Sequence, residues 1–100
     1  FAQVLSSLAV THIELGENEK GLLMGERALQ VIAETPGDPI FEAQAKVLVA
    51  IALLRLKRDS ARMALLVAEA RPVYVRLGQR GARHIKSLES TFGADAGVKR

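Results

Sequence analysis

The side chains that most often carry out catalysis are few and scattered in this sequence. The two histidines are His12 and His84, and there is no cysteine. Neither histidine belongs to an HExxH pattern, and no carboxylates stand at the spacing of metal ligands. Ser6 and Ser7 have no neighbouring base that would activate a hydroxyl, and the TPGDP segment at 35–39 lacks the Gly-Lys-Ser/Thr of a phosphate loop. The sequence therefore predicts no enzyme, no metal site and no cofactor.

Composition and charge restrict the class of protein further. The longest apolar run, VLVAIALL at 47–54, is too short for the roughly 20 residues that cross a bilayer, so we expect no membrane segment. The absence of cysteine suits a reducing, cytoplasmic location. Residues 1–50 carry three basic and seven acidic side chains, and residues 51–100 carry eleven and four. This asymmetry indicates either an acidic partner or attraction between neighbouring halves of the chain.

The spacing of apolar residues predicts an all-α fold of about five helices. We expect them at about 2–15, 19–34, 40–56, 60–76 and 82–92, because apolar residues recur there at helical spacing and polar or glycine-rich turns separate the segments. Gly16 should end the first helix and Asn18 should cap the second. Asp38 and Pro39 suit an N-cap and a first helical residue, and Pro72 predicts a kink or a frayed end in the fourth helix.

The chain also repeats itself with a shift of about 40 residues, which places the glycines of the second helix in a defined pattern. The shift matches Leu8 with Leu48, Ala9 with Val49, Gly21 with Ala61, Gly25 with Leu65 and Ala28 with Ala68. This spacing resembles the tetratricopeptide repeat, a helix–turn–helix unit. The first copy carries Leu5, Leu8, Ala9, His12, Gly21, Gly25, Ala28 and Ala33 at the family's spacings. The second carries Ala45, Leu48, Val49, Ala52, Ala61, Leu65, Ala68 and Val73.

The resemblance implies an α-α superhelix, or solenoid, within a domain at 1–93. Two helix–turn–helix repeats at about 2–35 and 42–75 would be followed by a capping helix at about 82–92 and a flexible tail at 94–100. The bulky aromatic positions of the family are not filled, and the period exceeds the usual ~34 residues. It is similar to long-period variants in large bacterial signalling proteins and transcriptional activators.

Several residues take specific places in this repeat. His12 occupies the family's tyrosine position and should pack half-buried, whereas His84 should be solvated. Gly21 should let the first two helices approach closely, and Gly25 marks either a hole or a place where a partner's side chain enters. Glu89 falls at a position that is small in the other copies, so we expect the fifth helix to end the array.

In this family the first helix of each pair lines a concave groove. The matched register places the peptide-binding positions at Gln3, Ser6, Val10, Ile13, Glu14, Ala43, Lys46, Ala50, Leu53 and Leu54. Lys46 alone matches the cationic residues with which family members clamp a peptide carboxylate, so we expect no such clamp. The apolar members would accept a peptide, an amphipathic helix or another copy of the protein, or would be buried against the fifth helix.

The sequence therefore predicts a non-catalytic protein–protein interaction scaffold that forms part of a larger protein. It would bind a peptide or helix on its concave face or self-associate as a dimer. The alternative is an effector-sensing segment of a bacterial transcriptional regulator. Nucleic-acid binding by the basic half is not favoured because stacking aromatics are scarce. The basic side chains concerned are Arg55, Arg58, Arg62, Arg71, Arg76, Arg80, Arg83 and Lys86.

Overall fold

The computed structural model describes residues 1–35 and 37–93, and this part of the chain is all-α. It contains α1 (Ala2–Glu14), α2 (Asn18–Glu34), α3 (Pro39–Leu56), α4 (Ser60–Arg76) and α5 (Ala82–Phe92), with a short 3₁₀ turn, η1 (Gly78–Gly81), before α5. The described residues include no strand. The fold class and all five helices predicted from apolar spacing are thus confirmed. The tail expected at 94–100 lies outside the described residues.

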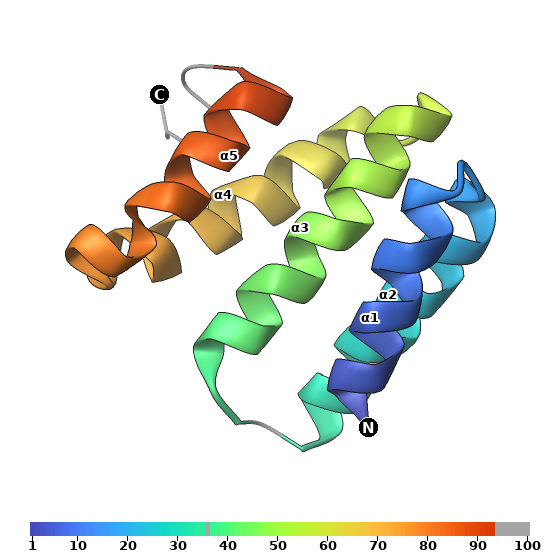
Figure 1. The fold of residues 1–100 in the computed structure, drawn as a ribbon, viewed down its shortest axis with the longest axis horizontal. Coiled ribbons are helices and arrows are strands. Elements are labelled where there is room, and N and C mark those ends of the chain that lie inside the picture. The colour runs from blue at the N-terminus through green and yellow to red at the C-terminus, as the bar shows by residue number, and fades with distance from the viewer. Residues whose placement is uncertain (36, 94–100) are drawn as a thin grey trace.

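The helices form two layers of successive hairpins. Each helix packs mainly against the helix before it and the helix after it. In Figure 1, α1, α3 and α5 lie on the near side, while α2 and α4 lie behind them. Helices α1, α3 and α5 therefore lie on the same face of the molecule (Figure 1). The molecule measures 30 × 30 × 21 Å along its principal axes. A site on this face draws most of its side chains from α1 and α3.

Local sequence signals set the helix ends, with two differences from expectation. The N-cap Asp38 accepts a hydrogen bond from the Ile40 backbone N–H to its Oδ1 at 2.9 Å, and proline follows it as predicted. Asn18 does not cap α2; it is the first residue of that helix. Pro72 lies inside α4, which reaches Arg76 as predicted, so of the kink or frayed end expected at this proline the frayed end is absent.

A left-handed residue closes the turn after α1 and after α3. After α1 this residue is Gly16 (φ +80°), and after α3 it is Lys57 (φ +53°). In each turn two backbone N–H groups donate hydrogen bonds to carbonyls in the last turn of the helix. In the second turn, Lys57 donates to the Leu54 carbonyl at 3.1 Å and Arg58 to the Leu53 carbonyl at 3.0 Å. Only Glu17 separates Gly16 from the next helix, whereas Arg58 and Asp59 both follow Lys57. The second turn is therefore one residue longer after its left-handed position.

The glycines of α2 bring neighbouring helices into close contact. A Cβ added at Gly21 would lie 2.5 Å from Cγ1 of Ile13 on α1, so the predicted small position is confirmed. A Cβ added at Gly25 would lie 2.8 Å from Cγ2 of Val49 on α3. Gly25 is buried, and the hole or partner entry expected there is wrong. The glycine instead allows α3 to pack closely on α2.

The repeat register on α4 differs from the predicted shift of 40. The matched Leu65 is 58% exposed and Ala61 is exposed as well. The residues that repeat the buried pattern of Gly25, Ala28 and Ile32 are instead Val67, Ala70 and Tyr74, which follow them by 42 positions. After its left-handed residue, the turn between α3 and α4 is one residue longer than the turn between α1 and α2, which accounts for one residue of the difference between the offsets of 42 and 40. The two copies therefore correspond in architecture, but not with the predicted residue pairing.

Candidate functional site

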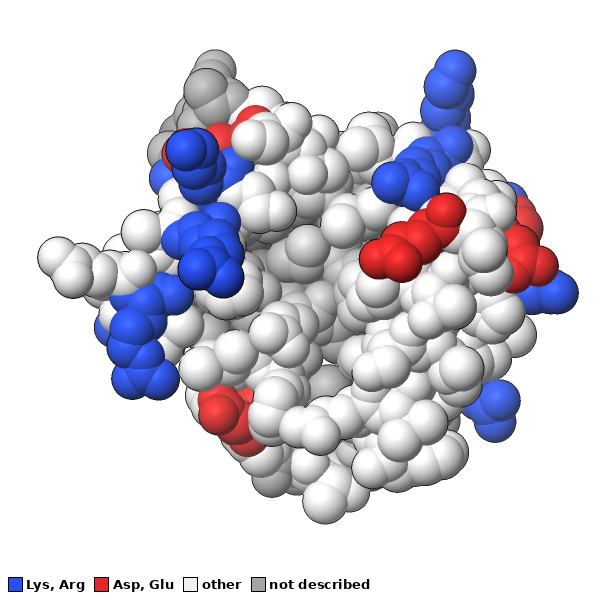
Figure 2. Space-filling model, in the orientation of Figure 1, with Lys and Arg blue, Asp and Glu red and all other residues white. Residues whose placement is uncertain are grey.

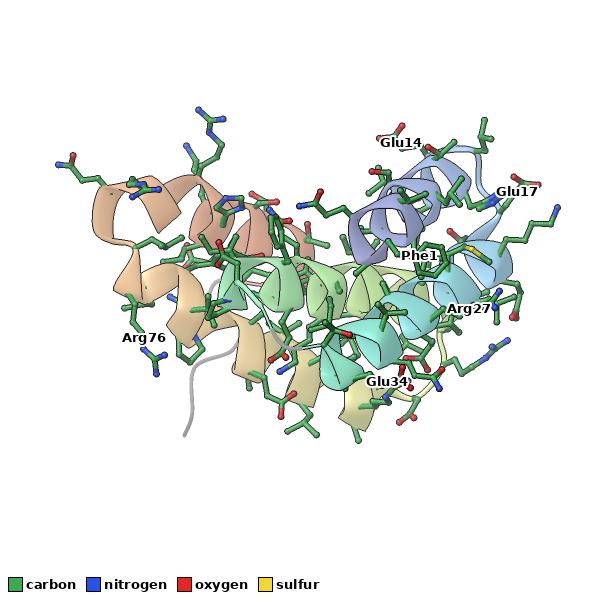
Figure 3. All side chains as sticks on the ribbon, turned by 90° about the horizontal axis from the view of Figure 1, so that it is seen from below. Phe1, Glu14, Glu17, Arg27, Glu34 and Arg76 are labelled. Carbon is green, nitrogen blue, oxygen red and sulfur yellow. The ribbon has the colours of Figure 1, made fainter. Side chains whose placement is uncertain are left out.

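A groove of about 520 Å³ opens on the face shared by α1, α3 and α5. In Figure 2 the same face is hollowed at its centre. Figure 3 shows α1 and α5 rising on opposite sides of α3, which forms the base. The residues lining this groove are Ala2, Gln3, Ser6, Ser7, Val10, Ile32, Phe41, Gln44, Val47, Leu48, Tyr74 and His84.

The groove is lined mainly by apolar, amide and hydroxyl side chains. Phe41 is 40% exposed and Val10 is 37% exposed, so apolar surface is available on both α3 and α1. Gln3 and Gln44 add amide donors and acceptors, and Ser6 adds a hydroxyl. None of the described residues that line the groove is Lys, Arg, Asp or Glu. Such a surface can hold uncharged side chains and hydrogen-bond a backbone, but its described lining has no lysine or arginine for a terminal carboxylate.

Three of the predicted peptide-binding residues, Gln3, Ser6 and Val10, line the groove. Three others, Ala43, Ala50 and Leu53, lie in the core. Ile13 is buried beside α2, and Glu14 and Leu54 are exposed but do not line the groove. Glu14 points from the end of α1 into solvent (Figure 3).

Lys46 is turned away from the groove as well. Its Nζ lies 3.2 Å from Oε1 of Glu42 and 3.4 Å from Oε1 of Glu69 on α4. These carboxylates neutralise the only cation that matched a carboxylate clamp.

The predicted positions on α3 miss the groove because the structural register there is 41, not 40. Gln44, Val47 and Leu48 line the groove at positions that follow Gln3, Ser6 and Ser7 by 41 residues. Helix α3 lies between α2 and α4 and is buried on two sides, so Val49 and Ala50 are both fully buried. Small apolar residues therefore fit either register, and the sequence comparison could not separate them. One sequence signal for the true register was available. Gly16 and Lys57, which close the two turns, are separated by 41 residues in the sequence.

Tyr74 and His84 form one wall of the groove, and sequence reasoning identified neither as a site residue. Their rings stack with centroids 4.6 Å apart and an interplanar angle of 14°. His84 is half-buried in this stack, so the prediction that it is simply solvated is wrong. The pair joins the end of α4 to the start of α5, which makes the wall dependent on the turn between them.

Burial raises the pKa of the Tyr74 hydroxyl to about 12, compared with 10 for an ordinary tyrosine. Between pH 10 and 12 the unfolded chain loses this proton while the folded chain retains it. Stability should therefore fall as the pH rises through this window. Because Tyr74 is the only tyrosine and the chain has no tryptophan, ultraviolet absorbance can follow its ionisation alone. We expect a midpoint near pH 12 in the folded protein and near pH 10 in guanidinium chloride; equal midpoints would contradict the burial.

His12 lies outside the groove and stabilises the first turn. It is half-buried, as predicted, and its Nδ1 lies 3.0 Å from Oε1 of Glu17. The hydrogen bond from His12, followed by that from Lys20, holds the pKa of the Glu17 carboxyl below its usual value. The contacts are local to the turn, which agrees with a structural role for this histidine.

The opposite charges of the two halves pair with each other within the chain, at its surface. Arg62 on α4 donates to both carboxylate oxygens of Glu26 on α2, at 2.6 Å each, and Arg58 pairs with Glu19. Arg55 donates to the Ile13 carbonyl at 2.9 Å. These contacts join the second helix pair to the first. The charge asymmetry therefore has an intramolecular use, and several cations considered for nucleic acid already have partners.

Two further observations concern helix hydropathy and possible metal ligands in residues 1–35 and 37–93. Within those ranges, no helix combines the length and apolarity needed to span a bilayer. The same residues contain no group of three or more histidine or carboxylate side chains placed to hold a metal ion. Comparison of the chain with protein-family models, curated proteins and solved structures found no match in any of the three.

Proposed function

We propose that this chain is a non-catalytic interaction module of the tetratricopeptide type, which binds a peptide segment of another protein in the groove of α1, α3 and α5. The observation that carries the proposal is the shared groove, in which α1 and α3 contribute residues at equivalent positions 41 apart. Repeated helix pairs that present such a concave surface are suited to extended partners. We further propose that the module acts in the cytoplasm as part of a larger protein.

The groove chemistry defines the kind of segment that fits. Val10, Phe41 and Val47 offer apolar contacts, so a bound segment should present at least one apolar side chain to them. Gln3 on α1 and Gln44 on α3 both line the groove and can hydrogen-bond the backbone groups of a peptide lying in it. A segment whose contact residues are charged would lose hydration without gaining a counter-charge in the groove.

Selection from a random peptide library, followed by calorimetric titration of recovered peptides, tests this proposal. Val10→Glu should weaken binding by about tenfold or more, because it places a carboxylate in the apolar contact. Leu65→Glu is the matched control, since Leu65 is 58% exposed on α4 and does not line the groove. Circular dichroism should show both variants folded. Failure to recover a peptide, or equal loss in both variants, would contradict the proposal.

A second candidate is the binding of a small effector by a regulatory segment of a transcription factor. The observation that favours it is the groove volume, which falls within the range of small-molecule sites. A thermal-shift screen of uncharged, partly aromatic fragments distinguishes the two candidates. Stabilisation by a fragment that Val10→Glu abolishes, without any recovered peptide, would favour the effector. Recovery of peptides alone would favour the protein partner.

A further inference from the structure

Three exposed cations stand beside the wall of the groove that α5 forms. Arg80 belongs to η1, and Arg83 and Lys86 belong to α5. In Figure 2, Lys and Arg side chains gather along the side of the hollow that α5 borders. Arg83 directly precedes His84, which lines the groove. We call Arg80, Arg83 and Lys86 the basic rim.

The basic rim has no carboxylate partner in the part of the chain that the structure describes. None of the ion pairs within residues 1–35 and 37–93 includes a rim residue. The one carboxylate of α5, Glu89, lies 3.1 Å from Nη2 of Arg71 on α4. Elsewhere in the basic half, Arg58 and Arg62 pair with carboxylates of α2. The fold thus pairs those arginines internally, whereas the charges of the basic rim face solvent.

The opposite wall of the groove has no such cations. Helix α1 contains neither Lys nor Arg, and its one carboxylate, Glu14, is exposed and forms no ion pair with another described residue. On α3, Lys46 is neutralised by two carboxylates, and Arg55 donates to the Ile13 carbonyl. The exposed cations beside the groove are therefore concentrated on its α5 side.

We propose, on the basis of the peptide-binding function stated above, that the bound segment is acidic as well as apolar, with its Asp and Glu side chains over the basic rim. The groove holds the apolar residues of the segment, and the rim attracts the carboxylates that flank them. These carboxylates need not enter the groove, because the rim residues do not line it. Complementary charge of this kind speeds encounter and fixes the orientation of a partner more than it adds affinity. The acidic flank of the segment therefore lies against α5 and not against α1.

A nucleic acid would also be attracted to the basic rim, but the rest of the groove does not suit it. Bases bind to exposed aromatic rings, whereas Tyr74 is 2% exposed and its ring stacks on His84. A phosphate backbone carries charge at every step, so beyond the rim it would cross the lining of the groove, which has no Lys or Arg among its described residues. A segment that combines apolar and acidic residues matches both surfaces.

Charge reversal at Arg83 tests this assignment. The peptides recovered by library selection should contain Asp or Glu beside their apolar residues more often than the unselected library does. In calorimetric titration of these peptides, Arg83→Glu should weaken binding about fivefold, because an exposed attraction becomes a repulsion. Arg76→Glu is the matched control: it changes the net charge equally, but Arg76 points from the end of α4 to the side away from the groove (Figure 3). It should bind within about twofold of the parent chain. Circular dichroism should show both variants folded.

Salt and peptide variants identify the charges involved. Raising the salt from about 50 to 500 mM should weaken the parent chain more than Arg83→Glu, since exposed pairs are screened. Replacing the acidic residues of a recovered peptide with Asn and Gln should reproduce the loss, and Arg83→Glu should then add little to it.

The outcomes separate the role of the rim from that of the groove. Recovered peptides without enriched Asp or Glu, or equal affinity for Arg83→Glu and Arg76→Glu, would overturn the acidic partner while Val10→Glu still reports on the groove. Failure to recover any peptide would overturn both proposals. Binding of a single-stranded oligonucleotide that Arg83→Glu weakens, with peptide affinity unchanged, would assign the rim to nucleic acid instead.

Discussion

Replacing Gly81 with alanine should destabilise the protein more than any other single methyl addition. The added Cβ would lie 1.9 Å from the Tyr74 carbonyl oxygen and 2.8 Å from the carbonyl carbon. Both are backbone atoms, so no change of side-chain rotamer can relieve the overlap. We expect Gly81→Ala to lower the free energy of unfolding by about 3 kcal/mol or more, at the upper end of overpacking effects. Denaturant titration measures this loss.

Gly37→Ala provides the matched control for this substitution. A Cβ at Gly37 would meet nothing within 4 Å. The added methyl group restricts the backbone of the unfolded chain. Gly37→Ala should therefore leave the free energy of unfolding unchanged or slightly raised. Gly81 itself has an ordinary negative φ of −91°, so the expected loss comes from the contact with Tyr74 and not from backbone strain. Equal stability of the two variants would show that α4 and α5 do not approach as described.

The same substitution should disturb the groove, because Gly81 fixes how α5 meets the end of α4. The ring of Tyr74 stacks on His84 three residues beyond Gly81, and Leu88 of α5 is buried with Tyr74 in one cluster. If α5 shifts, water should reach the Tyr74 hydroxyl. The pKa of Tyr74 in folded Gly81→Ala should therefore move from about 12 towards 10. This readout distinguishes a local shift of α5 from uniform destabilisation.

The sequence predicted the helices well because their signals are local. Apolar spacing gives each helix, Gly16 closes the first turn, and Asp38 with Pro39 starts α3. The side of each helix that faces the groove could be predicted only for α1. On α3 the adjacent Val49 and Ala50 are both fully buried, so burial on two sides removes the periodic contrast that defines a register. The groove positions on that helix were consequently displaced by one residue.

The remaining site features arise from contacts between distant elements. Tyr74 and His84 belong to different helices, and nothing in their spacing indicates a stacked pair. Gly81 stands in a turn where glycine is common, and only the path of α4 reveals that its hydrogen faces a carbonyl oxygen. Gly25 resembled a gap because the family has a bulky residue there, whereas Val49 of α3 fills the space from the other side. Such tertiary contacts leave no periodic trace in one sequence.

Gly21→Leu should also destabilise the protein strongly, since Gly21 sets the separation of α1 and α2. A Cβ at this position would lie 2.5 Å from Cγ1 of Ile13 and 3.2 Å from the Ala9 carbonyl oxygen. The gain in helix propensity, about 1 kcal/mol, is smaller than the cost of forcing a leucine into this contact. We expect a net loss of about 2 to 3 kcal/mol in denaturant titration. Ala33→Leu, at an exposed position of the same helix, should change stability by less than about 0.5 kcal/mol.

A double-mutant cycle identifies the contact responsible. Gly21→Ala introduces only the clashing methyl group, and Ile13→Ala removes the side chain that it meets. Ile13 is 5% exposed, so its truncation alone should cost about 2 to 5 kcal/mol and leave a cavity. In the double variant the new methyl occupies part of that cavity, and the combined loss should fall short of the sum of the single losses by about 1 kcal/mol or more. Strictly additive losses would show that Ile13 is not what limits the size of residue 21.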